Sequence, residues 1–270
     1  MREYTLSSGT KVKQPFNKIW FILAIVLVLT IIFATFIPIP DKIFLSELGT
    51  IMRRLFVPYG NRTWKDYFGY FNYQDMGIPL IQSIQISLGG TIIGSLLAFP
   101  IAFLSAGNIV KNKFLQIPTK VIMNFIRSIP IVILAVMAVF VVGTGILSGI
   151  VAVTLFSFGI MSKMLYEAIE TVDMSAFEAL ESSGANKFIA FYYAVFTEIK
   201  PIYLGYMIYI FEINVRSSAV LGYVGAGGIG QVISDNVLYN YNKVGVAIIV
   251  MFLTVIAVQI FSNWARRKLK

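Results

Sequence analysis

The sequence predicts an all-α membrane protein with six transmembrane helices. Of its 270 residues, 57% are hydrophobic and 13% are charged, whereas soluble proteins carry roughly 25% charged residues. Six apolar segments are each long enough, at about 1.5 Å per residue, to cross most of a hydrocarbon layer of about 30 Å. Cysteine and histidine are both absent, which excludes disulfides, thiolate or imidazole metal sites and Cys–His or Ser–His nucleophile pairs.

Residues 1–78 are expected to hold the first span and a helix on the membrane surface. The apolar segment 19–37 follows a basic N-terminus and ends at FIPIP without a small-residue cleavage site, so it predicts a retained span rather than a signal peptide. Between residues 43 and 55, apolar side chains recur at helical spacing among charged ones. This pattern predicts an amphipathic helix lying on the bilayer.

Three further spans are expected at residues 80–104, at 121–142 or 129–142, and at 150–166. In the first of these, Gly90 and Gly94 have the spacing that lets another helix approach closely. Its first half also carries polar side chains, which predict contact with a bundle interior. The next span has the sequence RSIP at 127–130 near its inner end, and residues 143–149 form a short turn.

Residues 201–221 and 244–261 are the fifth and sixth expected spans. The fifth contains Glu212, Asn214 and Arg216, although an ionisable residue at the centre of a membrane helix costs about 2.5–3.5 kcal/mol on insertion scales. Glu212 and Arg216 are four residues apart and are expected to pair, with Glu212 about mid-depth when counted from Pro201. Such a pair either only orders the bundle or marks a transport path, in which Arg216 could contact an anion at two points.

The basic residues predict the orientation of the six spans. Six spans place both termini on one side, and 15 of the 22 basic residues belong to that side. Six belong to the other side, and Arg216 lies within a span. This bias predicts cytoplasmic termini and a cytoplasmic loop 173–200. The basic residues flank apolar spans and form no long stripe, so no nucleic-acid partner is expected.

The hydrophilic loop 173–200 carries its own helix signals. Ser175 can cap a helix, Glu178 stands three residues later as in a capping box, and Gly184 can end the helix. These signals predict a helix of about two turns over residues 176–183.

The same loop resembles a motif of a known family. Glu178, Ala179, Gly184 and Ala185 resemble the cytoplasmic Glu-Ala-Ala coupling loop of ABC importer permeases, with Leu180 where a second alanine is common. The segment FEINVRSSAVLGYVGAGGIGQ at 211–231, together with RSIP and MSKMLYEAIE at 161–170, looks like the permease subunit of phosphonate-type ABC importers. RSIP and VGAGGIGQ also resemble methionine-type permeases, and it is FEINVRS that favours the phosphonate branch.

The resemblance implies the type I ABC importer permease fold, with a core domain at 79–262, a coupling loop at 173–200 and a basic tail at 263–270. It implies a bacterial inner-membrane protein that works as a homodimer with a second permease copy, together with two ATPase subunits and an extracytoplasmic substrate-binding protein. The residues expected to couple to the ATPase are Ser175, Glu178, Ala179, Gly184 and Ala185. Those expected along the translocation path are Arg216, Glu212, Asn214, Ser217, Ser218 and Arg127.

Residues 225–230, GAGGIG, match a dinucleotide-binding pattern only formally, because a predicted membrane span precedes them instead of a strand. The glycines suit a tight turn or a close helix approach, with anion binding by backbone N–H groups as a lesser alternative. The turn comprises Gly225, Gly227, Gly228 and Gly230.

No bond chemistry is expected in this chain, and no catalytic, cofactor-binding or metal-binding residue is assigned to it. Because the sequence has no G-x-x-x-x-G-K-[ST] motif, ATP and Mg²⁺ are expected on the partner ATPase. The main hypothesis is transport of phosphonate or a related small phosphorus oxyanion by alternating access, with phosphonate, phosphite and phosphate left open as cargo. The alternatives are a permease for another solute such as methionine, an ion-coupled secondary transporter using Glu212, and, with least support, a membrane-embedded enzyme.

Overall fold

The computed structural model describes residues 3–5, 11–13, 18–36, 45–59 and 61–269, and divides the chain into two compact units, Met1–Gly49 and Thr50–Lys270. In the first unit, β1 (Glu3–Thr5) pairs antiparallel with β2 (Lys11–Lys13), a short hairpin that the all-α prediction missed. Helix α1 (Lys18–Phe36) has the bounds expected for the first span to within one residue. Residue 37 and the prolines after it lie outside the described residues.

The segment before the first long helix of the second unit consists of short helices. They are α2 (Leu45–Phe56), α3 (Trp64–Gly69) and the π-helix η1 (Tyr73–Gly77). α2 confirms the predicted amphipathic helix, of which residues 43 and 44 lie outside the described part of the chain. Its position on a bilayer surface stays a prediction.

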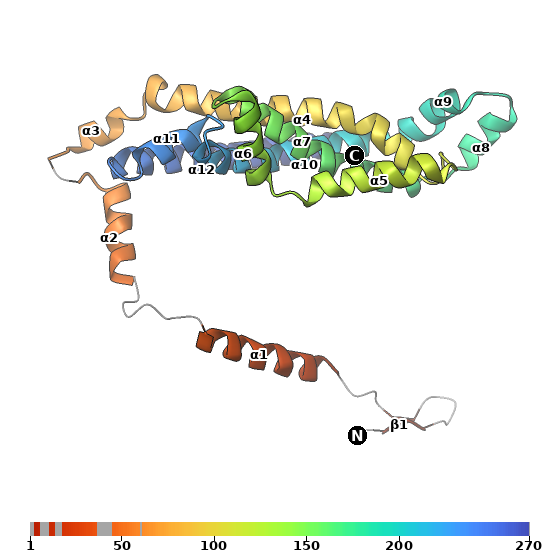
Figure 1. Cartoon of the computed structure of the whole chain (residues 1–270), viewed down its shortest axis with the longest axis horizontal. Coiled ribbons are helices and arrows are strands. Elements are labelled where there is room, and N and C mark those ends of the chain that lie inside the picture. Colours follow the sequence, from red (N-terminus) through yellow and green to blue (C-terminus); the bar gives the residue numbers. More distant parts are fainter. Residues whose placement is uncertain (1–2, 6–10, 14–17, 37–44, 60, 270) are drawn as a thin grey trace. The chain divides into compact units, whose positions relative to one another are not determined.

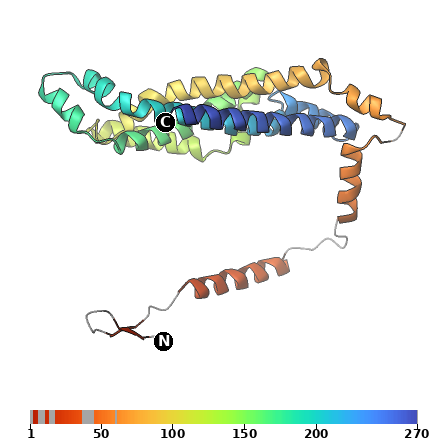
Figure 2. The same ribbon diagram turned by 180° about the vertical axis from the view of Figure 1, so that it is seen from behind.

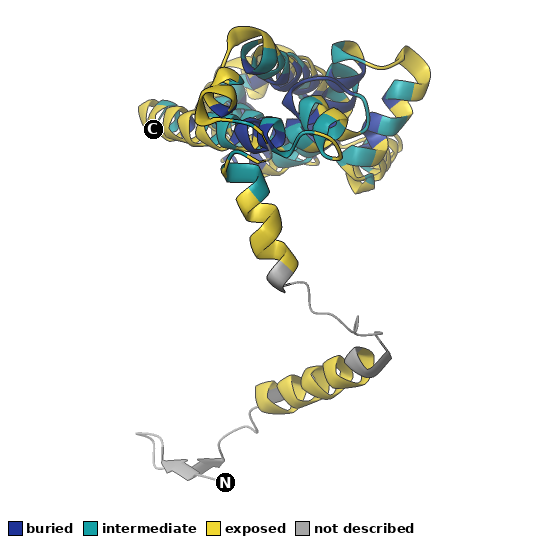
Figure 3. Ribbon diagram, turned by 90° about the vertical axis from the view of Figure 1, so that its left-hand side faces the viewer, coloured by how far each residue is buried: buried dark blue, intermediate teal, exposed yellow. Residues whose placement is uncertain are grey.

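Four long helices form the body of the second unit. They are α4 (Ile78–Ser105), α7 (Ile146–Glu170), α10 (Thr197–Tyr223) and α12 (Tyr241–Lys268), and they run side by side (Figures 1 and 2). Buried residues gather between these helices, and the faces turned away from the bundle are exposed (Figure 3). The predicted close approach is confirmed, because a methyl group at Gly90 would lie 2.5 Å from the side chain of Val153, and one at Gly94 would lie 2.6 Å from the carbonyl oxygen of Thr154.

The third predicted span is broken into two helices. α5 (Lys113–Ser128) and α6 (Ile131–Val142) meet at an angle of 93° around Ile129 and Pro130. Proline has no N–H for the helical ladder and drives the preceding residue into extended backbone, where Ile129 has φ −81° and ψ 124°. A continuous helix from residue 121 to 142 is therefore wrong, and RSIP forms a corner. The alternative span 129–142 agrees with α6 to within two residues.

Within the described residues, three helices are long and apolar enough to cross a membrane, or four if α5 and α6 count as one broken span. These three are α4 with the π-turn before it, α7 and α12. α10 has 27 residues, which correspond to roughly 40 Å of helix, but it carries the polar groups of the fifth predicted span. The count of six spans stays a prediction, as does the side of the membrane on which the termini lie.

The remaining short helices lie at the two ends of the bundle. α8 (Ser175–Ser182), α9 (Lys187–Ala190) and the π-helix η2 (Phe191–Phe196) lie at one end (Figure 1). α11 (Ile229–Asn236) lies at the other end, near α3 and the start of α12 (Figure 1). The hydrophilic loop and the glycine turn thus occupy opposite ends of the second unit.

Candidate functional site

The helix of the hydrophilic loop forms where predicted but begins differently. α8 begins at Ser175, so Ser175 is part of the first turn and the predicted Ser175 capping box is wrong. Instead the Ser175 N–H donates to Oδ1 of Asp173 at 3.0 Å. Gly184 ends the helix with φ +93°, where its N–H donates to the carbonyl of Glu181 at 3.0 Å. This left-handed glycine confirms the predicted stop.

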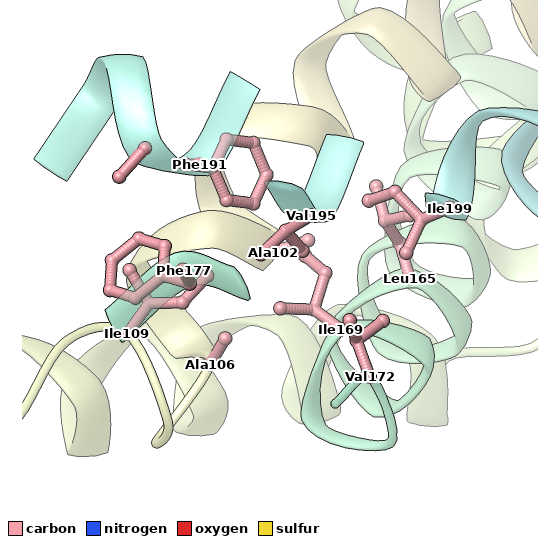
Figure 4. Packing of buried hydrophobic residues seen from close by; sticks show 11 residues of the cluster. Ala102, Ala106, Ile109, Leu165, Ile169, Val172, Phe177, Phe191, Val195 and Ile199 are labelled. Carbon is pink, nitrogen blue, oxygen red and sulfur yellow. The ribbon is translucent and has the colours of Figure 1, made fainter. Parts of the chain in front are cut away.

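A buried aromatic residue fixes the orientation of α8. Phe177 is 4% exposed and packs in a core cluster with Ile109 and Phe191, with Ile169 and Val195 in the same cluster (Figure 4). Glu178 and Ala179 are the next residues along the helix and both are exposed. Burial of Phe177 therefore turns the motif residues outwards, where another protein can contact them.

A buried carboxylate on α10 is paired with two arginines. Glu212 has 7% of its side chain exposed and pairs with Arg216, as predicted, and with Arg266 of α12 at 3.1 Å. Arg266 also donates to Asn263 and lies 5.8 Å from the ring centre of Tyr209. Two guanidinium groups and one carboxylate leave one formal positive charge in excess at this cluster.

The contact with Arg266 was not predicted from the sequence. Arg266 is separated from Glu212 by 54 residues and lies in the last turn of α12. In the sequence it is part of a basic tail that membrane orientation already accounts for. The contact places Glu212 beside the last turn of α12, while Glu212 itself lies near the middle of α10. Its depth in a membrane stays a prediction.

Asn214 connects three helices of the bundle. It is fully buried, and its amide nitrogen donates to Oγ1 of Thr91 on α4 and to Oγ of Ser157 on α7, both at 2.8 Å. Its Oδ1 finds no hydrogen-bond partner among the described residues. Asn214 therefore links α10 to α4 and α7 in the interior of the bundle.

The two serines of the predicted path bond to their own helix. Ser217 donates to the carbonyl of Ile213 at 3.1 Å, and the buried Ser218 donates to that of Val215 at 2.7 Å. Of the six residues predicted along the path, only Arg216 and Arg127 are exposed. Asn214 and Ser218 lie in the interior of the second unit.

Arg127 lines an open groove beside the α5–α6 corner. The groove has a volume of about 660 Å³ and lies between α5, α7 and α10, lined by Asn124, Arg127, Ser128, Ile160, Met164, Tyr209 and Ile213. Gly159 lets α7 approach the backbone of Arg127, since a methyl group there would lie 3.1 Å from the Arg127 nitrogen. Ile213 is three residues before Arg216 on α10. The exposed Arg216 therefore lies about one helical turn beyond the groove.

A second open groove, of about 640 Å³, adjoins the first. Both are lined by Met164 and Tyr209, and the second extends along α10 to Arg266. Together the grooves contain one arginine from α5, one arginine from α12 and one carboxylate, Glu198 of α10. No group of three or more potential metal ligands occurs among the described residues.

The glycine turn is structural, as the sequence predicted. Gly225, Gly227 and Gly228 all have positive φ, and a methyl group at Gly230 would lie 1.9 Å from the carbonyl oxygen of Ala219. Backbone N–H groups of the turn are used internally, because the Ile229 N–H donates to Oγ of Ser83 at 2.9 Å. This use favours close helix approach over anion binding.

Comparison with known proteins decides the family. Residues 90–270 match the family described as the binding-protein-dependent transport system inner membrane component. The chain belongs to this family. Its helical bundle and its exposed, glycine-terminated helix α8 are thus features of a transport-system membrane component.

Relatives of this transport family carry names that refer to phosphorus compounds. The chain is 32% identical to the phosphate-import permease protein PhnE of Mycolicibacterium smegmatis, over 73% of this chain and 38% of that protein. It is 36% identical to the putative phosphite transport system permease protein HtxC of Stutzerimonas stutzeri, over 68% of this chain and 66% of that protein. It is 33% identical to the phosphite transport system permease protein PtxC of the same organism, over 76% of this chain and 74% of that protein. The matches thus span between about two fifths and three quarters of these relatives.

Solved structures support the fold. A chain of the inward-facing MetNI methionine ABC transporter aligns with TM-score 0.57 at 21% identity, covering 70% of this chain and 93% of that one. A chain of a bacterial ABC transporter for the import of alginate aligns with TM-score 0.58 at 17% identity, covering 92% and 96%. At these identities the likeness establishes the permease fold and says nothing of cargo.

Proposed function

We propose that this chain is the membrane-spanning permease subunit of an ATP-driven importer for phosphonate or a related small phosphorus oxyanion. The transport family and the phosphate- and phosphite-permease relatives support this class of cargo. The structural observation that carries the proposal is the excess of arginine over carboxylate at the grooves, where Glu198 is the one acidic residue among the described lining residues. Arg127 and Arg266 line them, and Arg216 is half exposed on the same helix as Glu212.

The groups at the grooves suit a small oxyanion. A guanidinium donates two parallel hydrogen bonds to a phosphorus oxyanion, which a single ammonium cannot match in geometry. Glu212 pairs with Arg216 and Arg266 and so lowers the local positive charge. A cluster that is only weakly positive attracts an anion without holding it too tightly for release, as conduction requires.

The rest of the transporter is assigned as follows. Two copies of this chain, as a homodimer, sit in the bacterial inner membrane with both termini in the cytoplasm. Two ATPase subunits bind ATP and Mg²⁺ and contact α8 through Glu178, Ala179 and Gly184. An extracytoplasmic binding protein delivers cargo, and closure of the ATPases moves the two bundles so that the path alternates between the two sides. This chain performs no bond chemistry.

Two alternatives have less support. A methionine permease shares the fold of the MetNI chain, but that likeness is only 21% identical. A secondary transporter would need Glu212 as a mobile ion carrier, whereas Glu212 is paired with arginines of two helices.

Uptake into vesicles tests the cargo. Proteoliposomes holding this chain and its ATPase, supplied with the binding protein and ATP, should accumulate phosphonate, phosphite or phosphate and not methionine. Arg216→Ala should lower that uptake while ATPase association persists. Gly184→Asp should abolish both uptake and ATPase association. If Gly184→Asp left both unchanged, or if uptake proceeded on an ion gradient without any ATPase, the proposal would fail.

A further inference from the structure

The segment before α4 is held to the start of α12 by a buried amide. Asn242 is 1% exposed, and its Nδ2 donates to the carbonyls of Arg54 and Val57 at 3.1 and 2.9 Å. Its Oδ1 accepts from the backbone N–H of Tyr59 at 3.3 Å. Because three polar contacts converge on one buried side chain, this attachment is specific in geometry.

Further contacts fasten the same segment along its length. Lys243 pairs with Asp75 at 2.6 Å, and Nδ2 of Asn240 donates to the hydroxyl of Tyr70 at 3.0 Å. The Tyr67 hydroxyl donates to the carbonyl oxygen of Leu55 at 3.2 Å. Residues 54–59 and 61–75 therefore lie beside the first turn of α12, and η1 at their end contacts α4, at the end of the bundle where both helices begin.

Three exposed aromatic rings form a row on this segment. Trp64, Phe68 and Phe71 are 53%, 61% and 43% exposed. The rings of Trp64 and Phe68 stack at 6.0 Å, and those of Phe68 and Phe71 lie 6.1 Å apart. We call these three residues the aromatic row.

A buried tyrosine of the same helix fixes the direction of the row. Tyr67 is 3% exposed and packs in a core cluster with Met76, Ile229 and Val246. α3 has only six residues, and a capping box starts it, in which the Thr63 N–H donates to Asp66 at 2.8 Å. This hydrogen bond lowers the pKa of Asp66. Packing on one side and the cap at the start thus leave the aromatic row facing outwards.

We propose that the aromatic row lies in the headgroup region of the bilayer and anchors the segment before α4 to the membrane surface. Tryptophan is enriched where membrane helices meet water, because its ring is apolar with a polar edge, and phenylalanine occurs with it on the apolar face of helices that lie in the interface. The row stands at the level where α4 and α12 begin, and the chain continues from it into α4, whose first turns expose Ile78 and Ile81. Lys65 is exposed beside Trp64 and can reach lipid phosphate.

This membrane contact is independent of cargo and of ATP. It depends on α4 and α12 being membrane spans and holds for either orientation. A test that reads only the position of Trp64 therefore distinguishes a failure of the proposed membrane contact from a failure of the proposed transport function.

Fluorescence quenching by brominated lipids locates the row. The variant W20F/W264F of the full chain leaves Trp64 as its single tryptophan and keeps the native row. The chain is reconstituted in vesicles of phospholipid brominated either near the headgroup or near the chain end. We expect Trp64 to lose most of its fluorescence to bromine near the headgroup, much less to bromine near the chain end, and little to aqueous iodide.

Two reference variants calibrate the measurement in a background in which all three tryptophans are replaced by phenylalanine. Phe252→Trp reports an exposed site in the middle of α12, and Phe188→Trp reports an exposed site on the hydrophilic loop. Quenching of Trp64 no stronger than at residue 188, with full access to iodide, would overturn the proposal and place the row in water as a protein-binding surface. A depth profile like that at residue 252 would also contradict a headgroup position.

Discussion

Gly230→Ala tests whether the glycine turn exists to let α11 approach α10. A methyl group at residue 230 would lie 1.9 Å from the carbonyl oxygen of Ala219 and 2.7 Å from its carbon. Both atoms belong to the backbone, so α11 would have to withdraw by roughly 1.6 Å to restore contact distances of about 3.5 Å. Overpacking of this kind costs about 1–3 kcal/mol. The higher helix propensity of alanine offsets at most about 1 kcal/mol of this destabilisation. A net loss of stability is therefore expected.

Gly205→Ala is the control. Residue 205 lies inside the long helix α10, which contacts α11, but a methyl group there meets no described atom within 4 Å. Thermal unfolding of both variants in the same detergent, followed by loss of the monodisperse peak, should show a lower midpoint for Gly230→Ala. The control should match the native chain or exceed it slightly. Equal midpoints for Gly230→Ala and the native chain would refute the close-approach argument.

Three further predictions concern the bundle and its charges. Asn214→Ala should destabilise the bundle by about 1–3 kcal/mol, because it leaves two buried hydroxyls without their donor. Ser217→Ala, which removes a bond only to its own helix, should change the same thermal midpoint little. Arg216→Lys should retain ATPase association but lower anion uptake in vesicles, because an ammonium lacks the two-point geometry of a guanidinium. The hydrogen bond from the Thr63 N–H to ionised Asp66 should stabilise α3 at pH above 3.8 and be lost as the pH falls through the lowered pKa of Asp66. The Trp64 emission of the single-tryptophan chain should therefore change in acid. Asp66→Asn should remove that pH dependence.

Helix positions could be predicted because apolar length and glycine signals act locally. The positions of α4 and α12 follow from runs of apolar residues, and the end of α8 follows from one glycine that tolerates φ +93°. α12 nevertheless extends beyond the predicted 244–261 at both ends, because a helix continues into the polar residues that flank an apolar run. The corner at Pro130 was harder to predict, since a proline in a membrane helix either kinks it or ends it. The extended backbone at Ile129 shows that here it ends the helix.

Contacts between distant residues left no signal in the sequence. The pair of Glu212 with Arg216 could be predicted from a spacing of four, whereas Arg266 reaches the same carboxylate from the end of another helix. The Ser175 cap failed because Asp173, two residues earlier, accepts the Ser175 N–H. In a loop with several polar side chains, competing local bonds of this kind decide the first residue of a helix.

Co-purification with the ATPase tests the central claim most directly. The chain is tagged, expressed with candidate ATPases and purified, and ATP hydrolysis is measured for the native chain, Glu178→Ala and Gly184→Asp. Asn61→Ala, an exposed change at the opposite end of the bundle, serves as the control. The account predicts a stable complex that hydrolyses ATP, unaffected by the control and lost or uncoupled on changing α8. A chain that purifies alone with every candidate ATPase and still moves anions down an ion gradient would contradict it.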